Sequence, residues 1–243
     1  YPTRTEAAIF ARHGAAIAAE ALRIAGPAPP LIDLGAGDCA KAARLFPLLR
    51  PGRYVAVDIA VEFLREALLR LQAAHPGLAM LGVGLDFSQR LVLAPHITGD
   101  APALVFYPGS SLGNFAPDDA LRLLREARAL ARGGALLIGI DLVKPRAVLE
   151  AAYDDALGVT AAFNLNVLRN LNRRLGADFE PRQWRHVAFY DAMHARIEMH
   201  LEAREALAVR WRGGDERRFA AGERIHTENS YKWTPEGFAA LLR

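Results

Sequence analysis

Two kinds of hydrophobic pattern alternate along the first 143 residues of the chain. Short apolar runs such as Tyr54–Ile59 (YVAVDI) are typical of strands, whereas Glu62–Ala74 repeats its apolar positions with the period of a helix. The predicted strands are Leu31–Leu34, Tyr54–Ile59, Met80–Val83, Leu104–Tyr107 and Ala135–Leu142, and the predicted helices are Glu6–Ile24, Glu62–Ala74 and Pro117–Arg132. Strands that alternate with helices predict an α/β fold with a doubly wound, Rossmann-like parallel sheet.

The pattern changes after Lys144-Pro145. Two helices are expected, Ala147–Leu157 and Thr160–Leu175, the second with Thr160 as its N-cap. Period-2 runs at Ile197–Ala203 and Ala206–Arg212 then indicate an antiparallel sheet with one buried face. We therefore expect an inserted α+β subdomain over residues 144–232, joined by residues 1–4, while residues 5–143 and 233–243 form the first domain. The final helix is expected from Thr234, where a Thr-Pro pair resembles an N-terminal cap.

The composition argues against a membrane-spanning, secreted or nucleic-acid-binding protein. The chain is 52% hydrophobic and 23% charged, and its apolar runs are too short to cross a bilayer. Its start lacks a signal-peptide pattern, and the single cysteine, Cys39, excludes an intrachain disulfide, so we expect a cytoplasmic protein. The 30 Lys and Arg residues are scattered among 27 Asp and Glu residues, which predicts neither a nucleic-acid nor a membrane partner.

A glycine loop follows the first predicted strand. It reads Asp33-Leu34-Gly35-Ala36-Gly37-Asp38-Cys39-Ala40, and Asp58 ends the second strand where a carboxylate can bind a ribose diol. The pattern suits a nicotinamide dinucleotide, a flavin or S-adenosylmethionine, and a tight turn without a ligand is also compatible with it.

Three features favour S-adenosylmethionine. Asp33 lies two positions before the first glycine, where its carboxylate can approach a cationic cofactor. Asp38 would repel a diphosphate. After the third strand, Asp86 and Phe87 offer a carboxylate and an aromatic ring to an adenine.

Two further segments are unusually polar. Tyr107–Phe115 (YPGSSLGNF) follows the fourth strand, at the sheet edge where doubly wound folds bind ligands. Ile225–Lys232 (IHTENSYK) groups polar and aromatic side chains more densely than a plain β-edge requires, and a hydrated strand-to-helix loop is the plainer interpretation of it. Each segment alone is also compatible with a hydrated loop.

Nearly the whole chain resembles the L-histidine Nα-methyltransferases of ergothioneine biosynthesis. The resemblance is carried by the opening YPTRTE and by DLGAG, YVAVDI, the Asp86-Phe87 turn, YPGSSLGNF, GIDLVK, AYDDALGVTAAFNLN, RIEMHL and IHTENSYKW. The chain departs from that family in having Gly35-Ala36-Gly37 where a Gly-Ser-Gly loop is more frequent. Family members are also longer at both ends.

The resemblance implies roles for individual residues. It implies that Asn114 and Tyr153 hold the α-carboxylate of the substrate and that Tyr1 joins them. It also implies that Glu228 and Ser230 form hydrogen bonds with the imidazole and that Met199 lines the imidazole pocket. The cofactor residues implied by the loops and the resemblance are Gly35, Gly37, Lys41, Asp58, Asp86, Phe87, Tyr107, Gly109 and Ser110. The histidines at 194, 200 and 226 follow no ligand spacing, so no metal is expected.

The expected activity is transfer of methyl groups from S-adenosylmethionine to the α-amine of free L-histidine, as far as the trimethylated betaine hercynine, by a monomeric enzyme. Asn114 is the candidate to orient the amine, and Asn114 and Tyr153 are the candidate catalytic residues. The alternatives are an Nα-methyltransferase for another amino acid such as tryptophan, a nicotinamide-dependent oxidoreductase, and a binding module with an inactive site.

Overall fold

The computed structural model describes residues 2–242. These fall into two compact units. The first runs to Asp141 and resumes at Phe238, and the second is Leu142–Gly237. We had expected residues 144–232 in the second subdomain, together with residues 1–4. Residues 2–4 instead form the first turn of a helix of the first unit, because Pro2 is compatible with a helix start and no breaker follows it.

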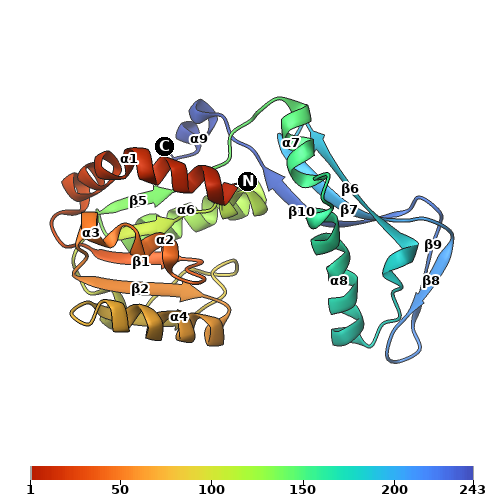
Figure 1. Cartoon of the computed structure of the whole chain (residues 1–243), viewed down its shortest axis with the longest axis horizontal. Coiled ribbons are helices and arrows are strands. Elements are labelled where there is room, and N and C mark those ends of the chain that lie inside the picture. The colour runs from red at the N-terminus through yellow and green to blue at the C-terminus, as the bar shows by residue number, and fades with distance from the viewer. Residues whose placement is uncertain (1, 243) are drawn as a thin grey trace. The chain divides into compact units, whose positions relative to one another are not determined.

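The first unit is a parallel five-stranded sheet in the order β3-β2-β1-β4-β5 (Figure 1). The strand order reverses direction beside β1, which makes the sheet doubly wound, as the sequence predicted. Its strands are β1 (Pro30–Leu34), β2 (Arg53–Asp58), β3 (Ala79–Gly84), β4 (Leu104–Tyr107) and β5 (Ala135–Ile138). Its helices are α1 (Pro2–Ala25), α2 (Ala40–Ala43), α3 (Phe46–Leu49), α4 (Val61–Ala74), α5 (Pro95–Thr98) and α6 (Pro117–Ala131), with a 3-10 turn, η1, at Ser111–Asn114.

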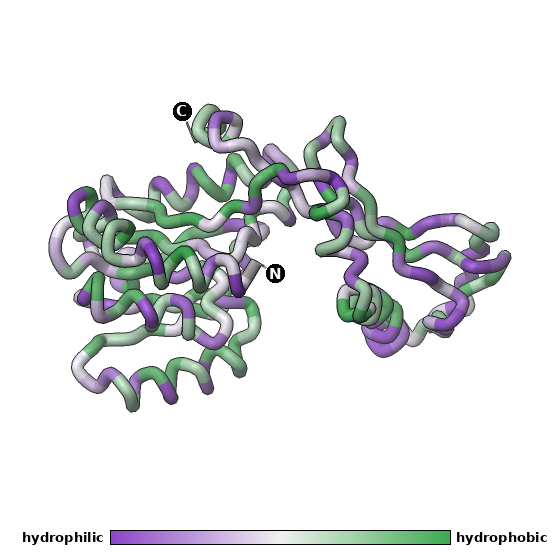
Figure 2. The backbone as a smooth tube through the Cα atoms, turned by 45° about the horizontal axis from the view of Figure 1, so that its top comes forward, coloured by the Kyte–Doolittle hydropathy of each residue, from purple (hydrophilic) through white to green (hydrophobic). Residues whose placement is uncertain are grey.

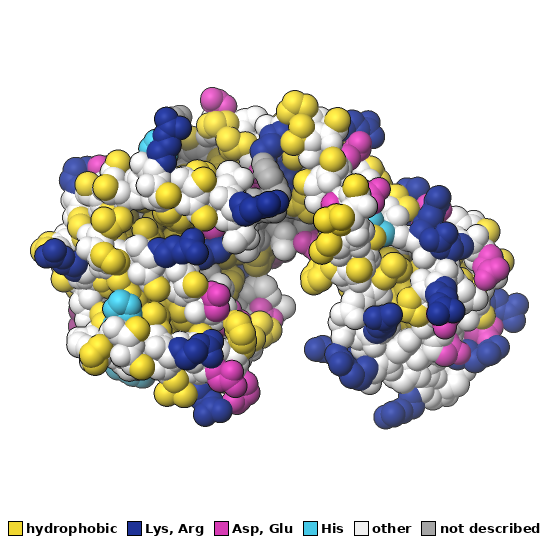
Figure 3. Space-filling model, in the orientation of Figure 1, with side chains coloured by type: hydrophobic (Ala, Val, Ile, Leu, Met, Phe, Trp, Pro, Cys, Tyr) yellow, Lys and Arg dark blue, Asp and Glu magenta, His cyan; other side chains and the backbone are white. Residues whose placement is uncertain are grey.

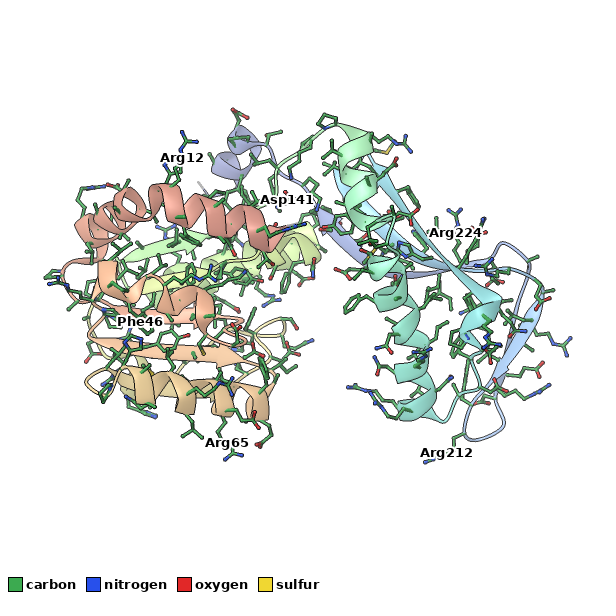
Figure 4. All side chains as sticks on the ribbon, viewed as in Figure 1. Arg12, Phe46, Arg65, Asp141, Arg212 and Arg224 are labelled. Carbon is green, nitrogen blue, oxygen red and sulfur yellow. The ribbon has the colours of Figure 1, made fainter. Side chains whose placement is uncertain are left out.

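The core of this unit lies on the central strands. Leu31, Tyr54 and Leu104 are completely buried, as expected of parallel strands covered by helices on both faces. In Figure 2, which is coloured by hydropathy, the strands of this sheet are mostly hydrophobic, while the helices alternate between hydrophobic and polar positions. In Figure 4, Phe46 of α3 is labelled, and its ring lies 5.1 Å from that of Tyr54 in an edge-to-face contact. Fully burying each such side chain contributes roughly 1.5–3 kcal/mol to stability.

The second unit is built on a three-stranded antiparallel sheet in the order β10-β7-β6, with a separate hairpin of β8 and β9. Its strands are β6 (Trp184–Asp191), β7 (Arg196–Ala203), β8 (Leu207–Arg210), β9 (Glu216–Phe219) and β10 (Arg224–Tyr231). Its helices are α7 (Arg146–Tyr153) and α8 (Val159–Leu175), and a 3-10 turn, η2, covers Pro181–Gln183. Helix α9 (Pro235–Leu241) follows, and the Thr234 hydroxyl caps it by accepting the Gly237 N–H at 3.0 Å.

One face of this sheet packs on α7 and α8 (Figure 1). Strand alternation puts Ile197, Met199, Leu201 and Ala203 of β7 on that face, and all four are buried. Leu149 of α7 packs on Ile197 and Met199, while Leu168 of α8 packs on Leu201 and Ala203. The buried face predicted from the period-2 pattern is therefore confirmed for β7.

Several predicted boundaries were wrong for local reasons. Helix α8 starts at Val159 rather than at Thr160, because the Asp155 carboxylate accepts the N–H groups of both residues and satisfies the first turn. Helix α7 ends at Tyr153 instead of Leu157, because the segment around Asp155 forms the turn that leads into α8. Strand β5 stops at Ile138, whereas we predicted Leu142. The segment interpreted as a loop at 225–232 is mostly strand β10, and β6 was not predicted.

The charged residues form no single basic surface on the face shown in Figure 3, where Lys and Arg side chains are spread among acidic ones. Many are paired in short networks. Arg224, labelled in Figure 4 on β10, donates from Nε to Glu202 at 2.8 Å. None of the helices among residues 2–242 has the length and apolar character needed to cross a membrane.

Candidate functional site

The glycine loop after β1 is fastened to the end of β2 by Asp58. One carboxylate oxygen of Asp58 accepts the Gly37 N–H at 2.9 Å, and the other accepts the Ala60 N–H at 2.9 Å. Gly35 has φ +71°, a conformation that side chains other than glycine rarely adopt. Each Asp58 oxygen retains a second lone pair, so the carboxylate can also accept bonds from a ligand.

A cavity of about 850 Å³ opens at the carboxyl ends of these strands. Six of the predicted ligand residues line it: Gly35, Asp58, Asp86, Phe87, Tyr107 and Asn114. The rings of Phe87 and Tyr107 meet edge to face with centroids 5.7 Å apart. The Tyr107 hydroxyl is buried and has no hydrogen-bond partner within residues 2–242. The cavity thus combines carboxylates with an aromatic wall.

Three other predicted cofactor residues, Lys41, Gly109 and Ser110, lie near Glu6, which the sequence did not single out. Glu6 of α1 accepts the Gly109 N–H at 2.6 Å and forms an ion pair with Lys41 at 2.6 Å. Gly109 has φ +83°, and a β-carbon there would lie 3.1 Å from Lys41 Nζ. Ser110 has φ +59°, a strained conformation for serine, as is frequent at ligand sites.

The large cavity is lined by none of Lys41, Gly109 and Ser110. Gly109 and Ser110 line a smaller cavity of about 90 Å³ with Glu6 instead. Lys41 lines neither of these two cavities. The sequence carried no local signal for Glu6, because its partners lie far along the chain.

Asp33 is buried beneath the glycine loop. It is 1% exposed, and one of its oxygens accepts the Tyr54 hydroxyl at 2.7 Å. Burial raises the pKa of Asp33 to about 7. Asp33 does not line the large cavity, so its expected approach to a cationic ligand stays a prediction.

In the second unit, a β-bulge decides which side chains of β10 face α7 and α8. The pairing of β10 with β7 shifts between His226 and Glu228, so that Glu228 pairs with Met199 and Ser230 pairs with Ile197. The Thr227 hydroxyl, at the bulge, donates to the Met199 carbonyl at 2.9 Å. The bulge therefore places Glu228 and Ser230 on the same face of the sheet as Met199. The sequence analysis did not predict the bulge.

Tyr153, at the end of α7, lies against this face. Its hydroxyl is 2.7 Å from Ser230 Oγ, and Lys232 Nζ donates to both oxygens, at 2.8 Å and 2.7 Å respectively. His186 Nε2 donates to the Tyr153 carbonyl at 2.8 Å, and its Nδ1 accepts from Asn164 at 3.0 Å. The structure thus brings Tyr153, Ser230, Met199 and Glu228 together in one unit, with Lys232 among them.

Glu228 is only partly exposed. Burial raises the pKa of its carboxyl above the usual value, and the charge of Lys232 opposes that rise. The remaining predicted substrate residue, Tyr1, lies outside the described residues.

The opposite face of β7 and β10 carries a different group of titratable residues. Glu198, His200 and His226 are close enough to hold a metal ion, because His200 pairs with His226 across the two strands. The Glu198 carboxylate, however, already bonds both Arg196 Nε, at 2.9 Å, and His200 Nε2, also at 2.9 Å. We therefore interpret the group as a charge-paired network and assign no metal to it.

Comparison with known proteins places these features in a family. The chain is 41% identical to a histidine N-alpha-methyltransferase of Mycolicibacterium smegmatis over 100% of its own length and 75% of the relative's. It is 37% identical, with the same coverage, to a histidine N-alpha-methyltransferase of Mycobacterium tuberculosis.

A solved structure supports the fold. That of the CcbJ methyltransferase from Streptomyces caelestis aligns with a TM-score of 0.51 at 20% identity and covers 95% of this chain and 81% of that one. Finally, the family model of histidine-specific, S-adenosylmethionine-dependent methyltransferases matches residues 1–243. The chain belongs to that family.

Proposed function

We propose that this protein transfers methyl groups from S-adenosylmethionine to the α-amino group of L-histidine, as far as hercynine, in ergothioneine biosynthesis. The observation that carries the proposal is the bulge in β10, which sets the Glu228 carboxylate and the Ser230 hydroxyl beside Met199 and Tyr153. We further propose that it acts as a monomer in the cytoplasm.

The chemistry of this face suits a histidine side chain. A neutral imidazole has one N–H donor and one acceptor nitrogen. Glu228, when ionised, accepts a hydrogen bond from the ring N–H, and the Ser230 hydroxyl lies beside it as a second polar partner for the imidazole. Met199, 4% exposed, offers the ring an apolar, deformable wall.

For the rest of the substrate, we assign the α-carboxylate to Tyr153 and Asn114. A tyrosine hydroxyl and an asparagine amide can each donate a hydrogen bond to a carboxylate oxygen. The Asn114 amide oxygen is also suited to accept a bond from the α-amine and so orient its lone pair. Reactivity requires that this amine be unprotonated and held in line with the methyl group. Positioning is therefore the main task of these residues, and no general base is assigned.

The residues of the first unit fit S-adenosylmethionine. Gly35, Gly37 and Asp58 would hold its ribose, Asp86 and Phe87 its adenine, and Lys41, Tyr107, Gly109 and Ser110 its amino-acid end and the adjoining loop. The fit is supported by the carboxylates of Asp58 and Asp86 and the ring of Phe87, which line the cavity, and by the positive φ angles of Gly35 and Gly109. When bound, the cofactor supplies a methyl group already activated by a positively charged sulfur.

Product analysis tests the proposal. We expect mass spectrometry of histidine incubated with the protein and S-adenosylmethionine to show products carrying one, two and three methyl groups. In a parallel thermal-shift experiment, we expect S-adenosylhomocysteine, and not NADH, to raise the melting temperature, because a bound ligand stabilises the folded state. Stabilisation by NADH with no methylated product would favour the oxidoreductase alternative.

A further inference from the structure

Lys232 is a buried lysine at the centre of the proposed substrate site. It directly follows β10 and is 3% exposed. Its backbone N–H donates to the Ala195 carbonyl at 2.7 Å, which fixes the start of its side chain. Its ammonium lies 4.7 Å from the centre of the Tyr153 ring, in addition to its hydrogen bonds to the Tyr153 and Ser230 hydroxyls.

Packing alone does not explain a lysine at this position. Removing an ammonium from water costs several kcal/mol unless charges or hydrogen bonds compensate, and an apolar side chain would fill the space without that cost. Two hydroxyls and the face of one aromatic ring are among the groups that stabilise the ammonium. The carboxylate of Glu228 interacts electrostatically with Lys232 and offsets more. A cation in this position is most useful where an anionic ligand binds.

The ammonium of Lys232 restricts how the hydroxyl protons of Tyr153 and Ser230 can point. An ammonium can only donate, so the oxygens of Tyr153 and Ser230 both accept from Lys232. The contact between those two oxygens uses one of their two hydroxyl protons. One hydroxyl proton is therefore left to point out of the triangle, and the nearby positive charge strengthens it as a donor.

We infer that Lys232 is a positioning residue of the substrate site, which directs a hydroxyl proton of the Tyr153–Ser230 pair toward the substrate and supplies the positive charge that favours its α-carboxylate. The inference rests on the proposed function, since it takes the ligand to be a free amino acid. Lys232 thus acts on the hydrogen bonding through Tyr153 and Ser230, and on the α-carboxylate through its charge.

Calorimetric titration of histidine into the whole chain tests this inference, because binding can be read without turnover. We expect Lys232→Met to weaken histidine binding on the order of 10- to 100-fold, the usual effect of losing a hydrogen bond made with a charged group. Binding of S-adenosylhomocysteine should not change, because its proposed residues lie in the other unit. Arg212→Met, at an exposed arginine of the second unit labelled in Figure 4, is the matched control and should bind histidine like the unaltered chain.

A double-mutant cycle separates positioning from general loss of structure. If Lys232 acts through Tyr153, Lys232→Met should weaken histidine binding much less in a Tyr153→Phe background than in the unaltered chain. Equal factors in the two backgrounds, or unchanged binding in the single variant, would overturn the inference. If Lys232→Met does not fold, Lys232→Arg and Lys232→Gln give the same comparison. We then expect the arginine variant to bind more tightly, and equal affinity would refute a role for the charge.

The pH dependence of histidine binding gives a second readout. Lys232 lowers the pKa of Glu228, so its removal should move the acidic limb of the binding profile to higher pH. The other titratable side chains of the elements packed here include Glu150 and Tyr153 of α7 and His186 and Tyr190 of β6. Both ring nitrogens of His186 are hydrogen-bonded, Nε2 to the Tyr153 carbonyl and Nδ1 to Asn164. An unmoved limb would count against the charge acting at this site.

These outcomes are distinguishable from failure of the proposed function. If the unaltered chain binds histidine but methylates no amino acid, the proposed function fails while the role of Lys232 can still be read from binding. If the chain methylates histidine and Lys232→Met binds it normally, the inference fails alone.

Discussion

Replacing Glu228 with alanine is expected to lower kcat/KM for histidine on the order of 100-fold, mainly through KM. The carboxylate is the acceptor that we assign to the imidazole N–H, and a hydrogen bond to a charged group is worth about 1.5–3 kcal/mol. The same change should improve the relative use of tryptophan. A partly buried carboxylate facing the larger apolar ring is costly, and alanine removes that cost. Steady-state kinetics with both amino acids measures the two effects.

The neighbouring Asn229 provides the matched control. It lies on the opposite face of β10, where its side-chain oxygen is 2.9 Å from His226 Nε2. Asn229→Ala should therefore leave the preference for histidine unchanged. Equal losses in the two variants would mean that β10 only supports the fold, and the assignment of Glu228 to the imidazole would have to be withdrawn.

Asp58→Ala should weaken binding of S-adenosylhomocysteine, also on the order of 100-fold. The change removes the acceptor of the Gly37 and Ala60 N–H groups, so the glycine loop loses its attachment to β2. It also removes the carboxylate that we assign to the ribose. Two hydrogen bonds to a charged group, each worth about 1.5–3 kcal/mol, readily account for a loss of this size. Calorimetric titration measures it directly.

Asp38→Ala is the corresponding control within the same loop. Asp38 is exposed and its carboxylate accepts only the nearby Ala40 N–H, at 3.0 Å, in the hydrogen bonds described. We expect a small effect on cofactor affinity. If the Asp38 variant lost as much affinity as the Asp58 variant, the effect would reflect loop folding and not a contact with the ribose.

Much of the first unit could be predicted from the sequence because its signals are local. Buried parallel strands have sequences that are short apolar runs, and the hydrophobic residues of the intervening helices recur with a 3.6-residue period. Four polar residues that follow the ends of these strands, Asp58, Asp86, Tyr107 and Asn114, all line one cavity.

The second unit was harder to predict for a specific physical reason. Strict alternation along β10 would put Glu228 and Ser230 on the same face as His226, whereas the bulge at Thr227 moves them to the face of Met199. Such a bulge depends on pairing with β7, which is distant in sequence. Glu6 was missed for the same reason, since its partners come from other parts of the chain, and Lys232 was missed although one of its partners, Ser230, lies only two residues away.

Competition among amino acids tests the central claim most directly. The protein would be given S-adenosylmethionine and an equimolar mixture of the twenty amino acids, and the products would be fragmented in a mass spectrometer to locate each methyl group. We predict methylated histidine as the dominant product, with every methyl group on the α-nitrogen. Dominant methylation of another amino acid, or of the imidazole ring, would contradict the account.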